Sequence, residues 1–381
     1  MATKELRRGD PLSILGPFIS SKGAKALLDY TYHGQDHSIL APTMYKIWAI
    51  FFYLVPKGVS PNVVTLSGLA AVLFAVFWAN LGLASSSTIC YILAVSVFIY
   101  QTADALDGMQ GRRVGMYQNP TTEMFDHGVD SCVTVITALT SIVFVLELHH
   151  PVPIMLLMFS GFIGFHAPTY EHLITNTMVF RGGPTNPTEA LVITQLILIL
   201  AGTFPWIFHL SPFYLGGLVL LAVGGSSLTM MHSVRELNKY YKGDQEKTMR
   251  SALAGWGPLI FVILVDSCWF PFLGEYYQKH NMLCLLAMSV PWNYSIFRTI
   301  LQEITSDKDI DTLSVLYGQT PALIPLLGMV LGLPFSVSVP LSLASSLFIY
   351  MYTVVVSLRE VCDALGMEHF WSIRDERLIK K

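Results

Sequence analysis

Charged side chains cluster between two apolar runs, in residues 104–130. This stretch reads DALDGMQGRRVGMYQNPTTEMFDHGVD and contains four aspartates, one glutamate, one histidine and two arginines. A charged group placed in hydrocarbon costs several kcal/mol unless it is paired or bound to a metal. We therefore expect residues 104–130 to form a functional site.

The four aspartates have helical spacing. Asp104 and Asp107 lie three residues apart, and Asp126 and Asp130 lie four apart, so each pair shares one face of a helix. Like charges that converge in a low dielectric repel strongly, and a divalent cation is the usual remedy. Oxygen ligands favour Mg²⁺ or Mn²⁺, and no Cys/His pair lies nearby in the sequence to indicate zinc. Two such ions are a common device for phosphoryl transfer.

Two glycines, Gly108 and Gly111, follow the first aspartate pair on the same helical stripe. Each costs about 1 kcal/mol relative to alanine inside a helix. Either a ligand is pressed against the backbone there, or another helix packs closely. Arg112 either binds phosphate or, like Arg113, marks the cytosolic end of the helix. The sequence leaves these alternatives open.

The composition places this stretch in a membrane protein. The 381 residues are 53% hydrophobic and only 13% charged, which excludes an ordinary soluble protein and is typical of a polytopic membrane protein. No cleavable signal peptide is visible, because residues 1–10 are charged and no short apolar core follows them directly. The five cysteines are scattered, without a C-x2-C pair or a disulfide framework.

Apolar runs long enough for spanning helices recur along the chain. We predict ten, at 62–83, 88–108, 127–148, 152–172, 190–209, 214–234, 252–273, 282–300, 315–335 and 340–358. The ten apolar residues 45–54 are too few to cross about 30 Å of hydrocarbon and favour an interfacial helix. The expected fold is therefore all-α and polytopic, with about ten transmembrane helices plus an N-terminal interfacial helix.

Basic residues test this topology, because Lys and Arg collect on the cytosolic side of a membrane. When the ten runs are threaded alternately, all of the 23 Lys and Arg except Lys279 fall on one side. Both termini and residues 104–130 are therefore expected to face the cytosol. We divide the chain into a cytosolic arm with the interfacial helix, catalytic helices, additional transmembrane helices and a cytosolic tail, at 1–59, 60–235, 236–360 and 361–381.

The spacing of residues 104–130 resembles that of the CDP-alcohol phosphotransferase family, whose pattern is D-x2-D-G-x2-A-R, eight to twelve residues, and then G-x3-D-x3-D. The eukaryotic choline/ethanolamine phosphotransferases are more similar still, because they share the D-H-G-x-D of residues 126–130. Two positions depart from the pattern: Gly111 stands where the family has Ala, and Thr122 where it has Gly. Weaker likenesses lie in the Y-x-G-x-D-x-S run at 32–38 and in the tail at 360–370.

The resemblance implies transfer of phosphocholine or phosphoethanolamine from CDP-choline or CDP-ethanolamine to diacylglycerol, with release of CMP. It implies that two Mg²⁺ or Mn²⁺ ions bound by the four aspartates grip the pyrophosphate, and that diacylglycerol enters from the bilayer. It also implies a homodimer in the endoplasmic reticulum or Golgi membrane, and we expect no nucleic-acid partner. The preference between choline and ethanolamine is not readable from the sequence.

His127 is the expected catalytic base, because it is the only histidine within the motif and histidine titrates near neutrality. The alternative is a histidine that only hydrogen-bonds a neighbouring carboxylate. We predict that Asp130 is catalytic as well as a metal ligand, and that Glu123 orients or ligates.

The predicted substrate-binding residues include two outside the charged stretch. Asn62 lies in a P-N-x-x-T segment that lines the nucleotide site in the family, and Glu189 lies in a P-T-E segment that resembles the family. An acid in the first turn of a helix explains Glu189 equally well. The full predicted set is Asn62, Gly108, Gly111, Arg112, Glu123 and Glu189.

Three rival functions remain. An aspartate-rich membrane prenyltransferase of the UbiA type also uses Mg²⁺, but it needs a second aspartate motif, for which only residues 307–311 are a candidate. A cation transporter also places carboxylates among its spans, but we find no broken helices or internal repeats of the kind typical of transporters. Thr122 indicates the third rival, a catalytically impaired relative. Release of CMP by the purified protein would separate them.

Overall fold

The computed structural model describes residues 17–206, 212–308 and 312–373. Apart from two short strands that pair in parallel, β1 (Gly34–Asp36) and β2 (Met178–Phe180), the regular elements of these residues are helices. An all-α fold is therefore confirmed for the described part of the chain. Of the acidic run at 307–311, residues 309–311 lie outside the described residues.

Short elements precede the long helices: α1 (Ser21–Ala26), the 3-10 turn η1 (Leu27–Asp29), β1 and α2 (Ala41–Phe52). The remaining elements are α3 (Pro61–Asn80), α4 (Ser86–Val114), α5 (Pro120–Thr140) with the π-helical η2 (Ser141–Val145), α6 (Pro151–Thr175), β2, α7 (Pro187–Thr203), α9 (Pro212–Tyr240), α10 (Gln245–Trp269) with η3 (Phe270–Phe272), α11 (Glu275–Ile304), α12 (Thr312–Gly318), η4 (Thr320–Leu323), α13 (Ile324–Leu331) and α14 (Phe335–Leu365). Each of the ten predicted apolar runs overlaps one of these helices or, for 315–335, the α12 to α13 segment.

Seven of the described helices are long and apolar enough to cross a membrane, or eight if the bent pair Thr312–Gly318 and Thr320–Leu331 is one span. Helix α7 is apolar but shorter, and α11 is not among the seven. The buried polar side chains in the second half of α11 include Asn293, Arg298 and Gln302, which protein rather than lipid covers. The described helices thus fit a polytopic membrane protein, and the number of ten spans stays a prediction.

Local sequence explains where the two helices of the charged stretch meet. Helix α4 ends at Gly115, whose φ of 78° is a left-handed conformation that glycine adopts without steric cost. Helix α5 begins after Asn119, whose Oδ1 accepts a hydrogen bond from the Thr121 N–H at 2.9 Å. This cap satisfies an amide that has no partner inside the helix. Because the connection is short, the end of α4 lies beside the start of α5.

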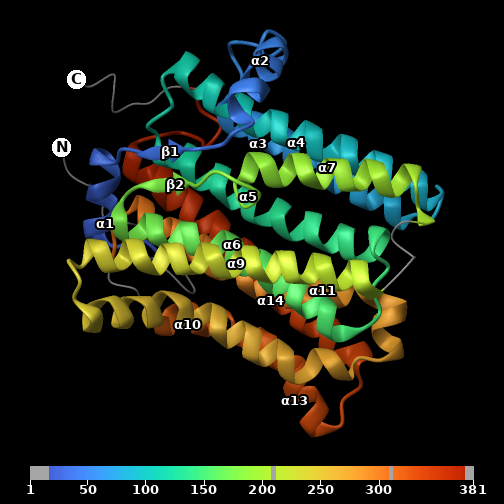
Figure 1. The fold of residues 1–381 in the computed structure, drawn as a ribbon. Coiled ribbons are helices and arrows are strands. Elements are labelled where there is room, and N and C mark those ends of the chain that lie inside the picture. The colour runs from blue at the N-terminus through green and yellow to red at the C-terminus, as the bar shows by residue number, and fades with distance from the viewer. Residues whose placement is uncertain (1–16, 207–211, 309–311, 374–381) are drawn as a thin grey trace.

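The long helices pack in layers (Figure 1). Helices α3, α4 and α7 lie side by side, and α6 lies along α9. Helix α11 contacts α5, α6 and α14. In the core between α6 and α11, Trp292 stacks on Phe162 with ring centroids 4.5 Å apart. This packing brings polar residues of α6 and α11 next to the charged stretch on α4 and α5.

Candidate functional site

Three of the four predicted aspartates come together between α4 and α5. Carboxylate oxygens of Asp104, Asp126 and Asp130 all lie within 4.8 Å of one another. No Lys or Arg among the described residues forms an ion pair with any of them. Oδ1 of Asp126 is buried and lacks a hydrogen-bond partner within the described part. Oxygen-only ligands at this spacing fit a hard divalent cation such as Mg²⁺ or Mn²⁺.

Hydroxyl groups orient two of the aspartates. The Tyr100 hydroxyl, one turn before Asp104 in α4, donates a hydrogen bond to Oδ1 of Asp130. The Thr65 hydroxyl of α3 donates to Oδ2 of Asp107. Asp107 is buried but is not part of the three-carboxylate group, so its role as a metal ligand stays a prediction. Neither hydroxyl donor was predicted from the sequence, although Thr65 belongs to the P-N-x-x-T segment.

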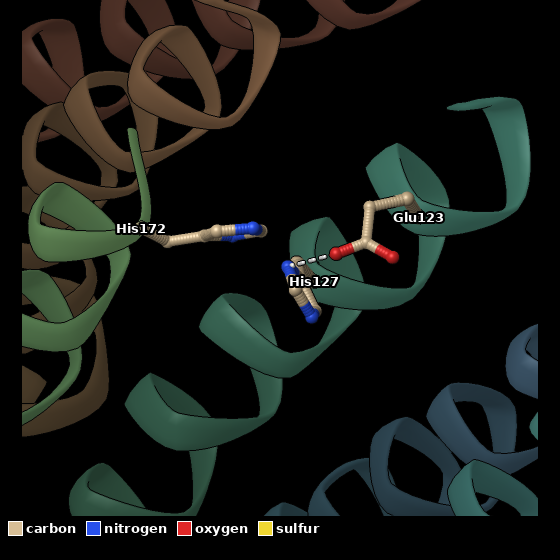
Figure 2. Close-up of side chains that lie close together, drawn as sticks. All are labelled: Glu123, His127 and His172. Atoms are coloured by element: carbon tan, nitrogen blue, oxygen red, sulfur yellow. Dashed lines mark ion pairs between the residues drawn. The ribbon is translucent and has the colours of Figure 1, made fainter. Parts of the chain in front are cut away.

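A second cluster, of one glutamate and two histidines, lies on α5 and α6 (Figure 2). Nδ1 of His127 lies 3.2 Å from Oε1 of Glu123, one turn earlier in α5. His172, near the end of α6, places its ring centroid 6.4 Å from that of His127. All three side chains are buried. No Cys/His pair lies nearby in the sequence, but the fold brings His172 of α6 next to His127.

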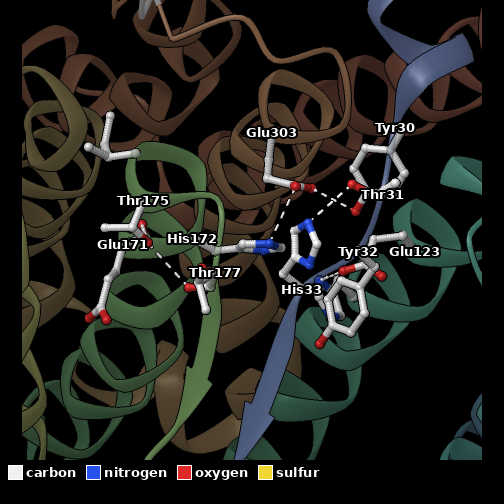
Figure 3. Close-up of polar contacts among 12 residues, drawn as sticks. Tyr30, Thr31, Tyr32, His33, Glu123, Glu171, His172, Thr175, Thr177 and Glu303 are labelled. Carbon is white, nitrogen blue, oxygen red and sulfur yellow. Dashed lines mark hydrogen bonds and ion pairs between the residues drawn. The ribbon is translucent and has the colours of Figure 1, made fainter. Parts of the chain in front are cut away.

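Polar contacts continue from His172 to α11 and to the N-terminal arm (Figure 3). Nε2 of His172 lies 3.4 Å from Oε1 of Glu303, and the Tyr30 hydroxyl donates to Oε2 of Glu303 at 3.5 Å. The Tyr32 ring centroid lies 5.8 Å from that of His172 and 6.2 Å from that of His127. Burial raises the pKa of both tyrosines, so they remain neutral phenols. None of these partners of the histidines was predicted from the sequence.

Close packing does not require either glycine. A Cβ added at Gly111 would lie 3.5 Å from backbone atoms of Tyr117, which is an ordinary van der Waals contact, so an alanine fits before the turn that follows α4. A Cβ added at Gly108 would meet only the Arg112 guanidinium, at 3.6 Å. Arg112 lies over the Tyr117 ring, 4.7 Å from its centroid, whereas Arg113 donates to a carbonyl of the α2–α3 connection at 2.7 Å. Contact of Gly108 and Arg112 with substrate stays a prediction.

Asn62 lies in the first turn of α3, beneath the C-terminal tail. Its Nδ2 donates to the Phe370 carbonyl, and its Oδ1 is buried with no hydrogen-bond partner among the described residues. The Phe370 ring also lies against Phe125 of α5, with centroids 5.3 Å apart. The tail therefore covers the N-terminal ends of α3 and α5. Asn62 keeps one free acceptor, and its contact with nucleotide stays a prediction.

Glu189 connects α7 to the N-terminal arm. Its Oε1 accepts hydrogen bonds from the Ile39 N–H at 2.6 Å and the Leu40 N–H at 3.3 Å. These amides precede α2, so the carboxylate fixes the arm in front of that helix. Oε2 of Glu189 is buried and has no hydrogen-bond partner within the described part. The first oxygen thus has a structural role, and contact of Glu189 with a headgroup stays a prediction.

The fold and the site together define an all-α membrane protein with a carboxylate cluster on two adjoining helices and a histidine–glutamate cluster beside it. The chain is 27% identical over 250 residues to the choline/ethanolaminephosphotransferase 1 of Saccharomyces cerevisiae, across 60% of this chain and 63% of that protein. It is 32% identical over 200 residues to the cholinephosphotransferase 1 of Rattus norvegicus, across 50% of each chain.

A longer alignment is with the choline/ethanolaminephosphotransferase 2 of Arabidopsis thaliana, 24% identical over 314 residues, which are 76% of this chain and 79% of that protein. No protein-family model matches the chain. The relatives confirm the resemblance to eukaryotic choline/ethanolamine phosphotransferases that residues 104–130 indicate, and they are consistent with a member of the CDP-alcohol phosphotransferase family. The matched part spans 63% of the yeast relative and half of the rat relative.

Proposed function

We propose that this chain transfers phosphocholine or phosphoethanolamine from CDP-choline or CDP-ethanolamine to diacylglycerol and releases CMP. The main observation behind the proposal is the cluster of three carboxylates formed by Asp104, Asp126 and Asp130, whose oxygens lie within 4.8 Å of one another. No Lys or Arg among the described residues forms an ion pair with this cluster. The names of the relatives support the donor and acceptor classes.

Asp104, Asp126 and Asp130, with Asp107 as the fourth candidate, would bind Mg²⁺ or Mn²⁺, two ions as the resemblance implies. When bound, such ions neutralise the charge on the pyrophosphate and on the departing CMP. The donor set fits this role because it is oxygen-only and because Oδ1 of Asp126 is a buried acceptor that no described group satisfies. The Tyr100 hydroxyl, which donates to Asp130, would hold that carboxylate in one orientation.

His127 would accept the proton of the diacylglycerol hydroxyl at Nε2. The Glu123 carboxylate, 3.2 Å from Nδ1, favours the positively charged imidazolium that forms. The hydroxyl oxygen attacks the phosphorus that bears choline or ethanolamine, and the bond from that phosphorus to the CMP oxygen breaks. CMP leaves with the electron pair. Because the base is buried, water has little access to compete as the nucleophile.

An apolar cleft of about 380 Å³ between α2, α3 and α4 is our candidate route for diacylglycerol. Its walls include Phe51, Val63 and Phe98. Thr102 and Ala103 also line it, and they immediately precede Asp104 in the sequence. Apolar walls suit acyl chains because a diacylglycerol that enters from the bilayer then stays in apolar surroundings and exposes no hydrocarbon to water. An acceptor in this cleft would approach the carboxylate cluster from the bilayer side of α3 and α4.

The finer topology belongs to the same proposal. We propose ten spans: the seven helices that meet the length and hydropathy requirements, the bent pair Thr312–Gly318 and Thr320–Leu331 as one span, and α7 and α11. We also propose that α2 lies in the membrane interface. The distribution of Lys and Arg supports a cytosolic site and cytosolic termini. The four-part division at 59, 235 and 360 also belongs to the proposal. Residence in the endoplasmic reticulum or Golgi and a homodimer are what the resemblance implies.

The test is a CMP-release assay. The purified full-length protein, given Mg²⁺, diacylglycerol and each CDP-alcohol in turn, is expected to release CMP and form the corresponding phospholipid. Chelation of the divalent ion should abolish release, and added Mn²⁺ should restore it. Folded protein that releases no CMP from either donor would refute the proposal and favour an impaired relative. Prenyl transfer or cation transport by the same preparation would identify one of the other rivals.

A further inference from the structure

The cluster of Glu123, His127 and His172 has the composition of a transition-metal site. The three residues are 8%, 6% and 2% exposed, and one potential ligand atom from each lies within 4.8 Å of the other two. Figure 2 shows the three side chains converging from α5 and α6. Two imidazoles with one carboxylate suit Zn²⁺, whereas the neighbouring aspartates offer only oxygen, which suits Mg²⁺.

The spacing of two of these atoms is compatible with metal ligation. Oε1 of Glu123 and Nδ1 of His127 are 3.2 Å apart, yet this Oε1 has no hydrogen-bond partner among the described residues. Two ligand atoms about 2.1 Å from a tetrahedral ion lie about 3.4 Å apart. The pair therefore has nearly the separation of one edge of a zinc coordination shell, and its carboxylate oxygen is buried and has no hydrogen-bond partner among the described residues.

The other histidine already has the support that metal-bound histidines usually have. Nε2 of His172 faces Oε1 of Glu303 at 3.4 Å, and Oε2 of Glu303 accepts a hydrogen bond from Tyr30 (Figure 3). A carboxylate on the second ring nitrogen fixes the orientation of a ligating imidazole and increases its basicity. This arrangement leaves Nδ1 of His172 as the nitrogen available to an ion.

We propose that Glu123, His127 and His172 form a binding site for one Zn²⁺ ion, separate from the aspartate cluster, in which Glu303 orients His172. Three protein ligands leave a fourth position for water or an exogenous ligand. One consequence rests on the proposed function: an ion at Nδ1 of His127 leaves the proton on Nε2, so the ring cannot accept another one. Zn²⁺ is then an inhibitor of CMP release.

Binding is tested on the full-length protein in excess Mg²⁺, which competes weakly for imidazole, by titration of Zn²⁺ against a fluorescent zinc chelator. We expect one tightly bound Zn²⁺ per chain. His172→Gln should weaken binding at least 100-fold, since it removes a ligand, and Glu303→Gln about 10–100-fold. His166→Gln is the matched control, because His166 is also buried on α6 but lies 3.0 Å from the Gly255 carbonyl. This control and Asp104→Asn are expected to bind Zn²⁺ as the wild type does.

X-ray absorption at the zinc edge should show two imidazole ligands in the wild type. Thermal unfolding without zinc shows whether each variant is folded, and Glu303→Gln keeps the test decisive if His172→Gln does not fold. The proposal is overturned if the wild type binds no Zn²⁺, if both variants bind it unchanged, or if Asp104→Asn is the variant that loses it. These measurements need no turnover, so absence of CMP release would refute the proposed function and leave the zinc site standing.

Discussion

At the scale of single residues, carboxylates of the proposed site are oriented by partners from other helices or other turns. Thr65 of α3 donates to Asp107, and Tyr100 donates to Asp130 from one turn before Asp104. A carboxylate held in one rotamer loses less conformational entropy when it binds a ligand. The orientation of the site therefore depends on hydroxyl groups that are not themselves ionised.

His127→Ala removes the proposed base and is expected to lower kcat for CMP release by about 10²–10⁴-fold. The KM for CDP-choline should change little, because the pyrophosphate is assigned to the aspartates. Steady-state kinetics over a range of CDP-choline concentrations measures both quantities. His150→Ala, at the exposed start of α6, is the control and should behave as the wild type. A rise in KM as large as the fall in kcat would remove the base assignment.

Thr122 offers a second test, because it stands where the CDP-alcohol phosphotransferase family, which this chain resembles, has glycine. It lies in the first turn of α5, and its Oγ1 is buried without a hydrogen-bond partner among the described residues. Thr122→Gly should lower the KM for CDP-choline by removing a branched side chain from the nucleotide side, while its lower helix propensity lowers stability by up to about 0.5 kcal/mol. An unchanged KM would show that the threonine does not obstruct the donor.

Part of the site was predictable from sequence and part was not. Asp104, Asp126, Asp130 and His127 belong to one stretch, and helical spacing alone indicates which of them share a face. His172 and Glu303 come from α6 and α11, and only the packing of those helices brings them to His127. For His172 and Glu303, the only sequence signal was a polar residue at the end of an apolar run. That signal is weak, because many such residues merely face the cytosol.

At the scale of elements, the N-terminal arm is attached to the bundle by polar contacts. Strand β1 pairs with β2, which follows α6, and Glu189 at the start of α7 accepts from two amides that precede α2. The arm also provides Tyr30 and Tyr32 to the histidine–glutamate cluster. Correct placement of the arm is therefore a condition for the geometry around His127.

Glu189→Ala is expected to destabilise the protein by about 1–3 kcal/mol, because two backbone amides lose their acceptor. Thermal unfolding and limited proteolysis of the arm measure this loss. Glu189→Gln keeps an Oε1 acceptor and serves as the conservative control. If Glu189 has only this structural role, the control keeps the wild-type Tm and KM. A control that keeps the Tm but raises the KM for CDP-choline would assign Glu189 to the headgroup.

At the scale of the whole molecule, the apolar runs predicted the helices well, because hydropathy over about twenty residues is a local property. They did not establish the number of spans, because burial inside the protein depends on neighbours. Helix α11 illustrates the difference, since its polar residues Asn293 and Arg298 are covered by other helices rather than exposed to lipid. Sequence alone cannot distinguish such a central helix from one that does not cross.

The two ends of α11 are expected to lie on opposite sides of the membrane. In a background without the five native cysteines, Asp307→Cys should react with an impermeant maleimide from the cytosolic side of sealed vesicles. Lys279→Cys should react only after the vesicles are opened. Labelling of both positions from one side would show that α11 does not span, and the ten-span topology would be wrong.

The most direct test of the central claim is the number of Mn²⁺ ions bound per chain in the presence of CDP-choline, measured by electron paramagnetic resonance. The wild type is expected to bind two ions. Asp126→Asn, which keeps the size of the side chain but removes its charge, should lose at least one of them and should release no measurable CMP. Wild-type Mn²⁺ binding by Asp126→Asn, or no binding by either protein, would contradict the assignment of the aspartate cluster.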